Sequence, residues 1–233
     1  MADRMTAEEF ATPSGRRSAQ RALWLDDHGW LRTLYDNTHE LPGGMRRTYQ
    51  PSPGRIARYA QEGVKTLINL RGIKTDGRQS GVYWLEKEAC EAAGIALVDL
   101  RAYSREAPKP EFLVDLDACF RSIAYPAVMH CKSGADRAGL AAVLYLFLKE
   151  GWPLEEALAQ LTYRYGHVKS GKTGVLDHFF AVYREAARRD GVVPNRDHFL
   201  NWVETAYVRD EVTAGFTPGA LGSLLTEVIL RRE

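Results

Sequence analysis

Cysteine is scarce in this chain of 233 residues, and long hydrophobic runs are missing. The three cysteines, Cys90, Cys119 and Cys131, are odd in number and widely spaced, which argues against a disulfide framework and for a reducing compartment. No apolar run approaches the roughly 20 residues of a membrane-spanning helix, and the N-terminal residues lack the apolar segment of a secretion signal. We therefore expect a cytoplasmic protein without a membrane span.

An excess of charge of one sign is also missing. The chain has 31 Lys and Arg against 30 Asp and Glu, which gives a net charge of +1. Proteins that bind nucleic acid or anionic membranes usually carry a clear basic excess, so we expect neither partner. Any attraction for an anionic substrate must be local. The hydrophobic content of 45% suits one compact domain, with or without an appendage.

One polar stretch at 130–139, His-Cys-Lys-Ser-Gly-Ala-Asp-Arg-Ala-Gly, lies between two apolar runs. The run at 127–129 predicts a buried strand, and the run at 140–148 predicts a buried helix. A loop between them points free backbone N–H groups at whatever lies above the N-terminus of the helix, which favours an anion. Cys131 supplies a sulfur nucleophile, and Arg137 a guanidinium that can hold two phosphate oxygens.

This His-Cys-x5-Arg spacing, with Gly134 in the loop and Gly139 after it, resembles the cysteine-dependent protein tyrosine and dual-specificity phosphatases. The Ile-Asn-Leu-Arg run at 68–71 and the Gln-Pro-Ser-Pro run at 50–53 look similar to the atypical dual-specificity branch. The resemblance covers roughly 49–180. It implies a phosphomonoester hydrolase that forms a phosphocysteine intermediate and needs no cofactor or metal. The implied substrate is a phosphotyrosine or other phosphoprotein, or an inositol phosphate.

The rest of the pattern predicts an α/β fold. Apolar runs at 64–71 and 95–100 predict two further strands. A helix is expected to begin near Pro53, and a second helical pattern at 81–93 stops at Gly94. Strands that alternate with helices predict a central, largely parallel sheet flanked by helices, as in the tyrosine-phosphatase-like fold, with ligands beyond the carboxyl ends of the strands.

The two ends of the chain differ from this central region. Residues 1–20 are polar and small, so we expect a loose N-terminal arm before a catalytic domain at 21–190. We interpret 191–233 as a helical C-terminal extension, because the resembled family needs fewer helices than the pattern predicts. The late helices are predicted at 153–165, 173–189, 197–210 and 218–231.

The residues between the nucleophile and the arginine are candidates for substrate binding: Lys132, Ser133, Gly134 and Ala135. An ordinary thiol is mostly protonated at neutral pH, so we expect the loop amides, the following helix and Arg137 to stabilise the Cys131 thiolate. His130 is expected to pack behind the loop and fix it.

Positive charge around the loop bears on the substrate. Lys132 is similar to a lysine of phosphoinositide phosphatases, although a solvated lysine explains it equally. A basic rim is predicted from Arg101, Arg105, Lys169 and Lys172. These cations favour a substrate with more than one phosphate or an acidic neighbourhood.

Three carboxylates are candidates for the acid that protonates the leaving group. In most of the resembled family the acid is an aspartate on a loop upstream of the cysteine. Here the loop at 101–110 contains no aspartate, and its acidic residue is Glu106. Asp136 precedes Arg137, as in myotubularin-type lipid phosphatases, although a helix cap also explains it. Asp99 lies on the strand before the loop. Asp136 and Glu106 are preferred to Asp99.

Ala138 supports an alternative to an active enzyme. Many members of the resembled family have Ser or Thr at this position, whose hydroxyl stabilises the departing thiolate. Alanine here, and the missing upstream aspartate, favour a phosphate-binding module with weak turnover. The intact Cys131, Gly134 and Arg137 favour the enzyme, which is our prediction. Low-molecular-weight phosphatases and arsenate reductases place Cys-x5-Arg near the N-terminus, whereas here it is mid-chain.

Overall fold

The computed structural model describes residues 5–26, 36–73 and 79–219. Its strands form one sheet in the order β1-β2-β5-β3-β4. β1 pairs with β2 in antiparallel fashion, and all other neighbouring pairs are parallel. The predicted α/β fold with a largely parallel sheet is confirmed. The strands are β1 (His39–Leu41), β2 (Met45–Thr48), β3 (Thr66–Asn69), β4 (Ala96–Asp99) and β5 (Ala127–His130).

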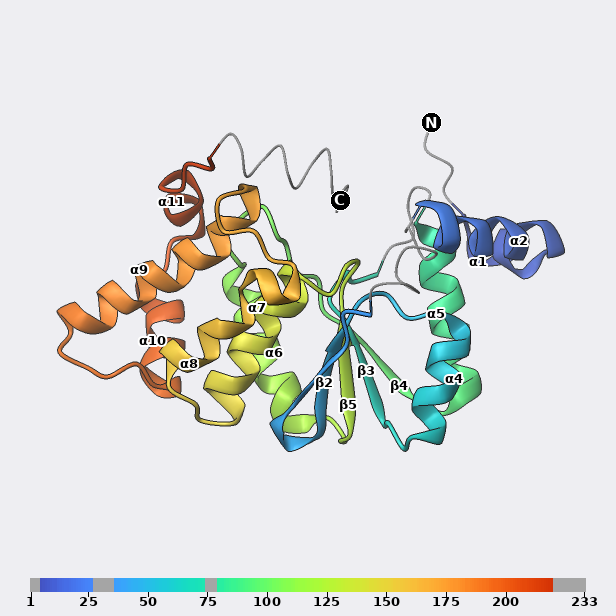
Figure 1. Ribbon diagram of the computed structural model, residues 1–233, viewed down its shortest axis with the longest axis horizontal. Helices are drawn as coiled ribbons and strands as arrows, with labels where there is room; N and C mark the ends of the chain where they lie inside the picture. Colours follow the sequence, from blue (N-terminus) through green and yellow to red (C-terminus); the bar gives the residue numbers. More distant parts are fainter. Residues whose placement is uncertain (1–4, 27–35, 74–78, 220–233) are drawn as a thin grey trace.

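Helices cover both faces of this sheet (Figure 1). Side chains alternate between the faces along each strand, and the apolar core divides accordingly. Ile68 and Met129 belong to the larger cluster, on the face of α6, α7 and α9. Leu67 and Val128 belong to a smaller cluster, on the face of α4 and α5. The helices named here are α4 (Pro53–Gln61), α5 (Ser80–Ala93), α6 (Pro110–Ser122), α7 (Asp136–Leu144) and α9 (Val175–Arg189).

Most predicted strands and helices appear within a few residues of their expected bounds, but the helix predicted at 153–165 is much shorter. α8 (Leu154–Ala157) gives way to the 3-10 turns η4 (Leu158–Gln160) and η5 (Tyr163–Tyr165). The Thr162 hydroxyl donates to the carbonyl of Ala159, a local hydrogen bond that competes with helix continuation. The core helix α7 continues as a π-helical turn, η3 (Tyr145–Lys149), and α9 is preceded by the 3-10 turn η6 (Lys172–Gly174).

The N-terminal segment is helical, so the expected loose arm is wrong for residues 7–21. Thr6 and Glu9 form a capping box at the start of α1 (Ala7–Ala11), and such a box satisfies two otherwise free N–H groups. α2 (Pro13–Arg21) and the π-helical turn η1 (Ala22–Asp26) follow. Phe10, Ala19 and Leu23 are buried with apolar residues of α5. Scattered apolar positions therefore attach this segment to the domain.

The C-terminal extension packs on α6 and α9. The helix predicted at 197–210 is divided into α10 (Arg196–Thr205) and α11 (Arg209–Ala214). The Trp202 ring lies 5.8 Å from the Phe179 ring, and the Tyr207 ring lies 5.3 Å from it, so these aromatics are core contacts between the extension and α9. The helix predicted at 218–231 falls almost entirely outside the described residues. Within the described ranges, no helix has the length and apolar character needed to cross a bilayer.

Candidate active site

The loop between β5 and α7 lies at the carboxyl edge of the parallel strands. Cys131 directly follows β5 and is only 2% exposed. Its backbone N–H donates to the carbonyl of Thr48, at the end of β2, over 3.4 Å. Arg137 is the second residue of α7. The fold therefore places the two predicted catalytic residues at the two ends of one short loop at a helix N-terminus.

Gly134 lets this loop turn tightly against the end of β2. Its φ is +74°, a conformation that only glycine adopts without strain. A Cβ atom there would lie 2.9 Å from the backbone of Thr48 and Tyr49. The loop is also held by the Gln50 N–H, which donates to the carbonyl of Lys132 over 3.3 Å, and by the Asn37 side chain, which donates to the carbonyl of Ser133 over 3.1 Å.

Arg47 holds the loop from behind. This side chain of β2 is completely buried, and its Nη2 donates to the carbonyls of Gly134 and Ala135 over 2.7 and 3.0 Å. Its Nη1 donates to the carbonyl and side chain of Gln160 over 2.8 and 3.0 Å. In a trans peptide the C=O and the next N–H point in opposite directions, so the N–H groups that follow these two loop carbonyls face away from Arg47. N–H groups oriented in this way are suited to bind an anion.

Sequence reasoning missed Arg47, although β2 carried a signal. Arg46 and Arg47 are neighbours on a strand, so their side chains point to opposite faces, and one of them must be buried when both faces are covered. A Cβ atom at Gly139 would lie 3.5 Å from Nη2 of Arg47, an ordinary contact, but only 2.8 Å from Cδ2 of Leu161, so the glycine lets Leu161 pack closely against α7. The Tyr165 ring stacks on the guanidinium of Arg47, whose carbon lies 4.4 Å from the centroid of that ring.

His130 packs behind the loop, as expected. It is fully buried, and its Nε2 lies 2.9 Å from Oε1 of Glu86 on α5, a carboxylate that is only 2% exposed. The same carboxylate oxygen accepts a hydrogen bond from the Gln50 side chain over 2.7 Å. Glu86 thus lies against the ring next to Cys131 without a well-directed hydrogen bond to it, and its hydrogen bond with Gln50 ties α5 to the end of β2.

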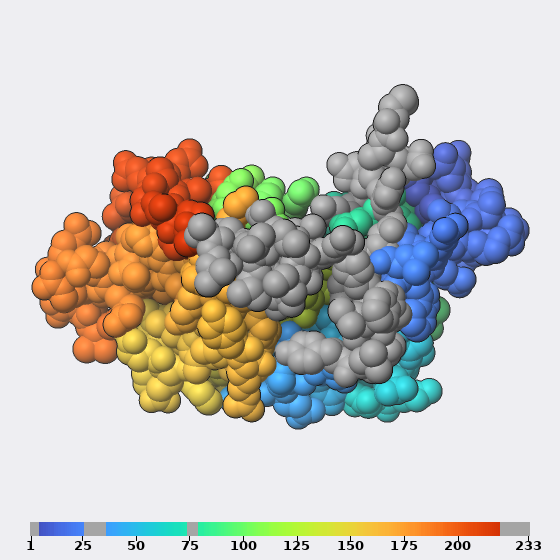
Figure 2. All heavy atoms as spheres, turned by 45° about the horizontal axis from the view of Figure 1, so that its top comes forward, coloured from blue at the N-terminus to red at the C-terminus, as the bar shows by residue number. Residues whose placement is uncertain are grey.

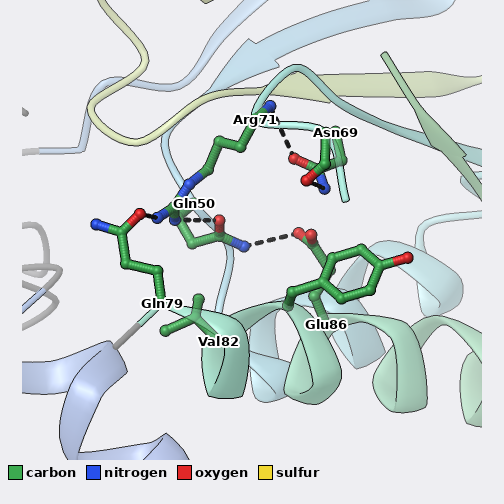
Figure 3. A pocket seen from close by; sticks show the side chains of 8 residues that line it. Gln50, Asn69, Arg71, Gln79, Val82 and Glu86 are labelled. Atoms are coloured by element: carbon green, nitrogen blue, oxygen red, sulfur yellow. Dashed lines mark hydrogen bonds between the residues drawn. The ribbon is translucent and has the colours of Figure 1, made fainter. Parts of the chain in front are cut away.

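Glu86 also lines a small polar pocket, together with Gln50 and Arg71 (Figure 3). Arg71 follows β3, and its guanidinium donates to the side-chain oxygens of Gln50 and Gln79 over 2.6 and 2.7 Å. Asn69 accepts from the backbone N–H of Arg71 over 2.9 Å. The ends of β2 and β3 and the start of α5 are therefore connected by side-chain amides, which sequence reasoning did not anticipate.

Asp136 is engaged by a buried histidine. Its Oδ1 lies 2.7 Å from Nδ1 of His167, whose Nε2 lies 2.6 Å from Oδ2 of Asp177 on α9. Burial alone would lower the pKa of His167, but the hydrogen bonds to the two carboxylates outweigh it and raise that pKa above its ordinary value. The arrangement fits an imidazolium that donates to a carboxylate on each side, at the first residue of α7.

This cluster predicts a specific pH dependence of stability. Because the folded pKa of His167 is raised, its contribution is complete below the unfolded value of about 6.5 and is lost as the pH rises through the folded pKa. We expect His167→Gln to cost about 3 kcal/mol of unfolding free energy at pH 6, and less at alkaline pH. Urea denaturation across this range measures it.

The matched control for that measurement is His178→Gln, which changes a histidine on α9 outside the cluster. Its unfolding free energy should follow that of the wild type at every pH. A constant difference between His167→Gln and the wild type from pH 6 to pH 9 would contradict the charged-histidine assignment.

The other two acid candidates also have partners. Glu106 is half-exposed and forms an ion pair with Arg209 of the C-terminal extension. Asp99 accepts hydrogen bonds from the Asn69 amide over 2.8 Å and the Tyr83 hydroxyl over 2.9 Å. Burial raises the pKa of Asp99. The geometry leaves none of the three without a competing contact, so the identity of the acid stays a prediction.

The predicted basic rim changes in one respect. Lys169 lies 3.1 Å from Oδ1 of Asp177, so its charge is largely compensated within the histidine cluster.

Lys132 is buried, with 6% exposure, and is therefore not the solvated lysine of the alternative interpretation. Ala138 is completely buried in the larger apolar cluster.

These features define a class of site: a cysteine and an arginine at the two ends of a loop that precedes a helix and whose carbonyls are bound by a buried arginine. No protein-family model matches the chain. The dual specificity protein phosphatase TpbA of Pseudomonas aeruginosa strain UCBPP-PA14 is 28% identical over 128 residues, which are 54% of this chain and 53% of the relative. TpbA of strain PAO1 is 27% identical over the same shares. The chain thus spans about half the length of the curated relatives it matches.

Solved structures of such phosphatases are similar at a lower level. One crystal structure of P. aeruginosa TpbA has 22% sequence identity to this chain and a TM-score of 0.43. The match covers 77% of this chain and 89% of the TpbA chain. The crystal structure of PTPMT1 has 18% identity and a TM-score of 0.46, covering 65% of this chain and 99% of that chain. The resemblance to cysteine-dependent dual-specificity phosphatases is confirmed by the sequence matches.

Proposed function

We propose that this protein hydrolyses phosphomonoesters through a phosphocysteine intermediate. The observation that carries the proposal is the loop from Cys131 to Arg137, in which the buried Arg47 binds the carbonyls of Gly134 and Ala135 so that the N–H groups after them point away from Arg47, as an anion site requires. The match to dual-specificity phosphatases over 128 residues supports the same chemistry.

The reaction has two steps. The Cys131 thiolate attacks phosphorus, an S–P bond forms, the P–O bond to the leaving group breaks, and the leaving oxygen takes a proton from an acid. Water then attacks phosphorus, the S–P bond breaks, and inorganic phosphate and the thiolate are released. Throughout, the planar guanidinium of Arg137 and the loop amides stabilise the charge on the non-bridging oxygens.

The proposed substrate is a phosphotyrosine or another phosphorylated protein side chain. P. aeruginosa TpbA was crystallised in complex with pTyr, which supports a phosphotyrosine substrate for the related region of this chain. An inositol phosphate is the second candidate, because Lys132 adds a buried positive charge to the loop itself. Comparison of kcat/KM for a phosphotyrosine peptide and an inositol phosphate distinguishes the two.

The proton donor is tested by its dependence on the leaving group. Removal of the true acid should slow hydrolysis of an alkyl phosphate by about 100-fold or more and affect p-nitrophenyl phosphate much less, because nitrophenolate leaves without a proton. Asp136→Asn and Glu106→Gln are compared on both substrates, and we expect one of them to show this difference.

The control for that comparison is Glu111→Gln, which removes a carboxylate from the first turn of α6 and should leave both rates unchanged. Equal losses on both substrates in Asp136→Asn would mean that Asp136 only holds α7 through His167. If neither variant shows the leaving-group dependence, both assignments are wrong and Asp99→Asn is the next variant. Wild-type turnover close to the uncatalysed rate would instead favour a phosphate-binding module.

A further inference from the structure

Three cations surround one aromatic ring on the segment between β4 and α6. The guanidinium carbons of Arg101 and Arg209 lie 5.3 and 5.7 Å from the centroid of the Tyr103 ring, and Nζ of Lys109 lies 5.5 Å from it. Each contact is individually favourable, but together they bring like charges close to one another. In a chain whose net charge is only +1, this is a concentrated basic cluster.

Two of the three charges are not compensated by a nearby acid. Arg209 is paired with Glu106. Arg101 and Lys109 are both exposed, and neither forms an ion pair with any residue in the described part of the chain. The Tyr103 ring offers only the weak attraction of its π face. The cluster therefore retains positive charge, which a bound anion would stabilise.

A ladder of backbone hydrogen bonds connects the cluster to the catalytic loop. The Leu70 N–H donates to the carbonyl of His130 over 2.9 Å, and the Ala102 N–H donates to the carbonyl of Leu70 over 3.1 Å. Each step crosses one strand spacing, so Ala102 lies about 10 Å from the end of β5, where Cys131 begins the loop. The basic cluster and the nucleophile thus share the carboxyl edge of the sheet.

The C-terminal extension holds this segment in place. The Tyr207 hydroxyl donates to the carbonyl of Pro108 over 2.6 Å, and Nε of Arg209 donates to the carbonyl of Ala107 over 2.9 Å. The Ala107 N–H donates to the hydroxyl of Thr213 over 3.1 Å. In Figure 2 the green atoms of the segment lie beside the red extension. The backbone just before Lys109 is therefore held in place before a ligand arrives, which reduces the entropic cost of binding.

We propose that Arg101 and Lys109 form a second anion subsite, which binds a further phosphate group of the substrate whose first phosphate occupies the Cys131 loop. The inference rests on the proposed function for that first phosphate. Because the ladder separates the backbone of the cluster from that of the loop by about 10 Å, a bisphosphate with about this spacing is the first ligand to test. A chain of about six carbon atoms spans that distance.

The test compares the binding of hexanediol bisphosphate and hexyl monophosphate to the Cys131→Ser protein by calorimetry. We expect the bisphosphate to bind about tenfold more tightly, a preference that falls on addition of salt. Lys109→Ala and Arg101→Ala should each reduce the preference about three- to fivefold. The control Lys65→Ala removes an exposed cation just before β3, at the amino edge of the sheet, and should leave it unchanged.

Equal affinities for the two compounds, or a preference that Lys109→Ala and Lys65→Ala change equally, would overturn the subsite. Turnover of hexyl monophosphate by the wild type is measured separately, because it tests the proposed hydrolysis and does not involve the subsite. A doubly phosphorylated peptide and an inositol polyphosphate, compared in the same variants, distinguish the two sources of a second phosphate. A loss in Lys109→Ala with either of them supports the subsite, and no loss with both contradicts it.

Discussion

Serine in place of Cys131 is expected to abolish hydrolysis of p-nitrophenyl phosphate and to preserve phosphate binding. The rate should fall by about four orders of magnitude or more, because the serine proton is held too tightly for the hydroxyl to act as the nucleophile. Binding should persist because the loop amides and Arg137 do not depend on sulfur. Steady-state kinetics and calorimetry with inorganic phosphate measure the two properties.

Cys119→Ser is the matched control. The Cys119 thiol lies in the core on α6, and burial raises its pKa to about 11, so it is not a nucleophile at neutral pH. Its replacement should leave kcat/KM within about twofold of the wild type. Turnover that survives in Cys131→Ser would exclude the covalent mechanism, and loss of phosphate binding in the same variant would show that the sulfur also maintains the loop.

Arg47→Met is expected to reduce both stability and activity. Methionine fills part of the volume but leaves the carbonyls of Gly134, Ala135 and Gln160 without their buried donor. The loss of a buried charged donor to several acceptors should cost about 3 kcal/mol of unfolding free energy. The loop amides then lose their common orientation, so we expect kcat/KM to fall about 100-fold.

Arg46→Met is the control that tests whether the losses depend on the buried position of Arg47. Arg46 precedes Arg47 on β2 and forms ion pairs with Glu40 and Glu62 at the surface. Exposed pairs of this kind contribute about 1 kcal/mol or less, so this variant should remain active and nearly as stable as the wild type. Similar losses in the two variants would contradict the supporting role of Arg47.

The fold was predictable where one local pattern decides the structure. The run at 127–129 and the helix after it are buried on all sides, so hydrophobicity alone identifies both. Gly134 needs a positive φ, and Gly94 ends α5 in the left-handed conformation. The same local signals placed Cys131 and Arg137 correctly at the two ends of one loop.

The sequence indicates that one arginine of β2 is buried, but the partners of the supporting residues could not be predicted, because they are distant in the sequence. Arg47 and Gly134 are separated by 87 residues, and Gln50 and Glu86 by 36. No periodic pattern encodes such pairs, which depend on how the sheet is assembled. The loose N-terminal arm was wrongly predicted for a similar reason: its apolar residues are few, and only α5 gives them a surface to cover.

The identity of the acid is undecided for a physical reason. Each of the three carboxylates lies close to the carboxyl edge of the sheet, where the leaving group is expected. Each also has a partner that favours its charged form, such as His167 for Asp136 and Arg209 for Glu106. Only the dependence of rate on the leaving group separates a proton donor from a structural carboxylate.

Trapping of the intermediate tests the central claim most directly. The wild type is mixed with p-nitrophenyl phosphate, quenched in acid within milliseconds, digested and examined by mass spectrometry. We expect one phosphoryl group on the sulfur of Cys131, accumulated because Ala138 provides no hydroxyl to assist the second step, and none in Cys131→Ser. Steady turnover without a phosphocysteine, or a phosphoryl group on another residue, would contradict the mechanism.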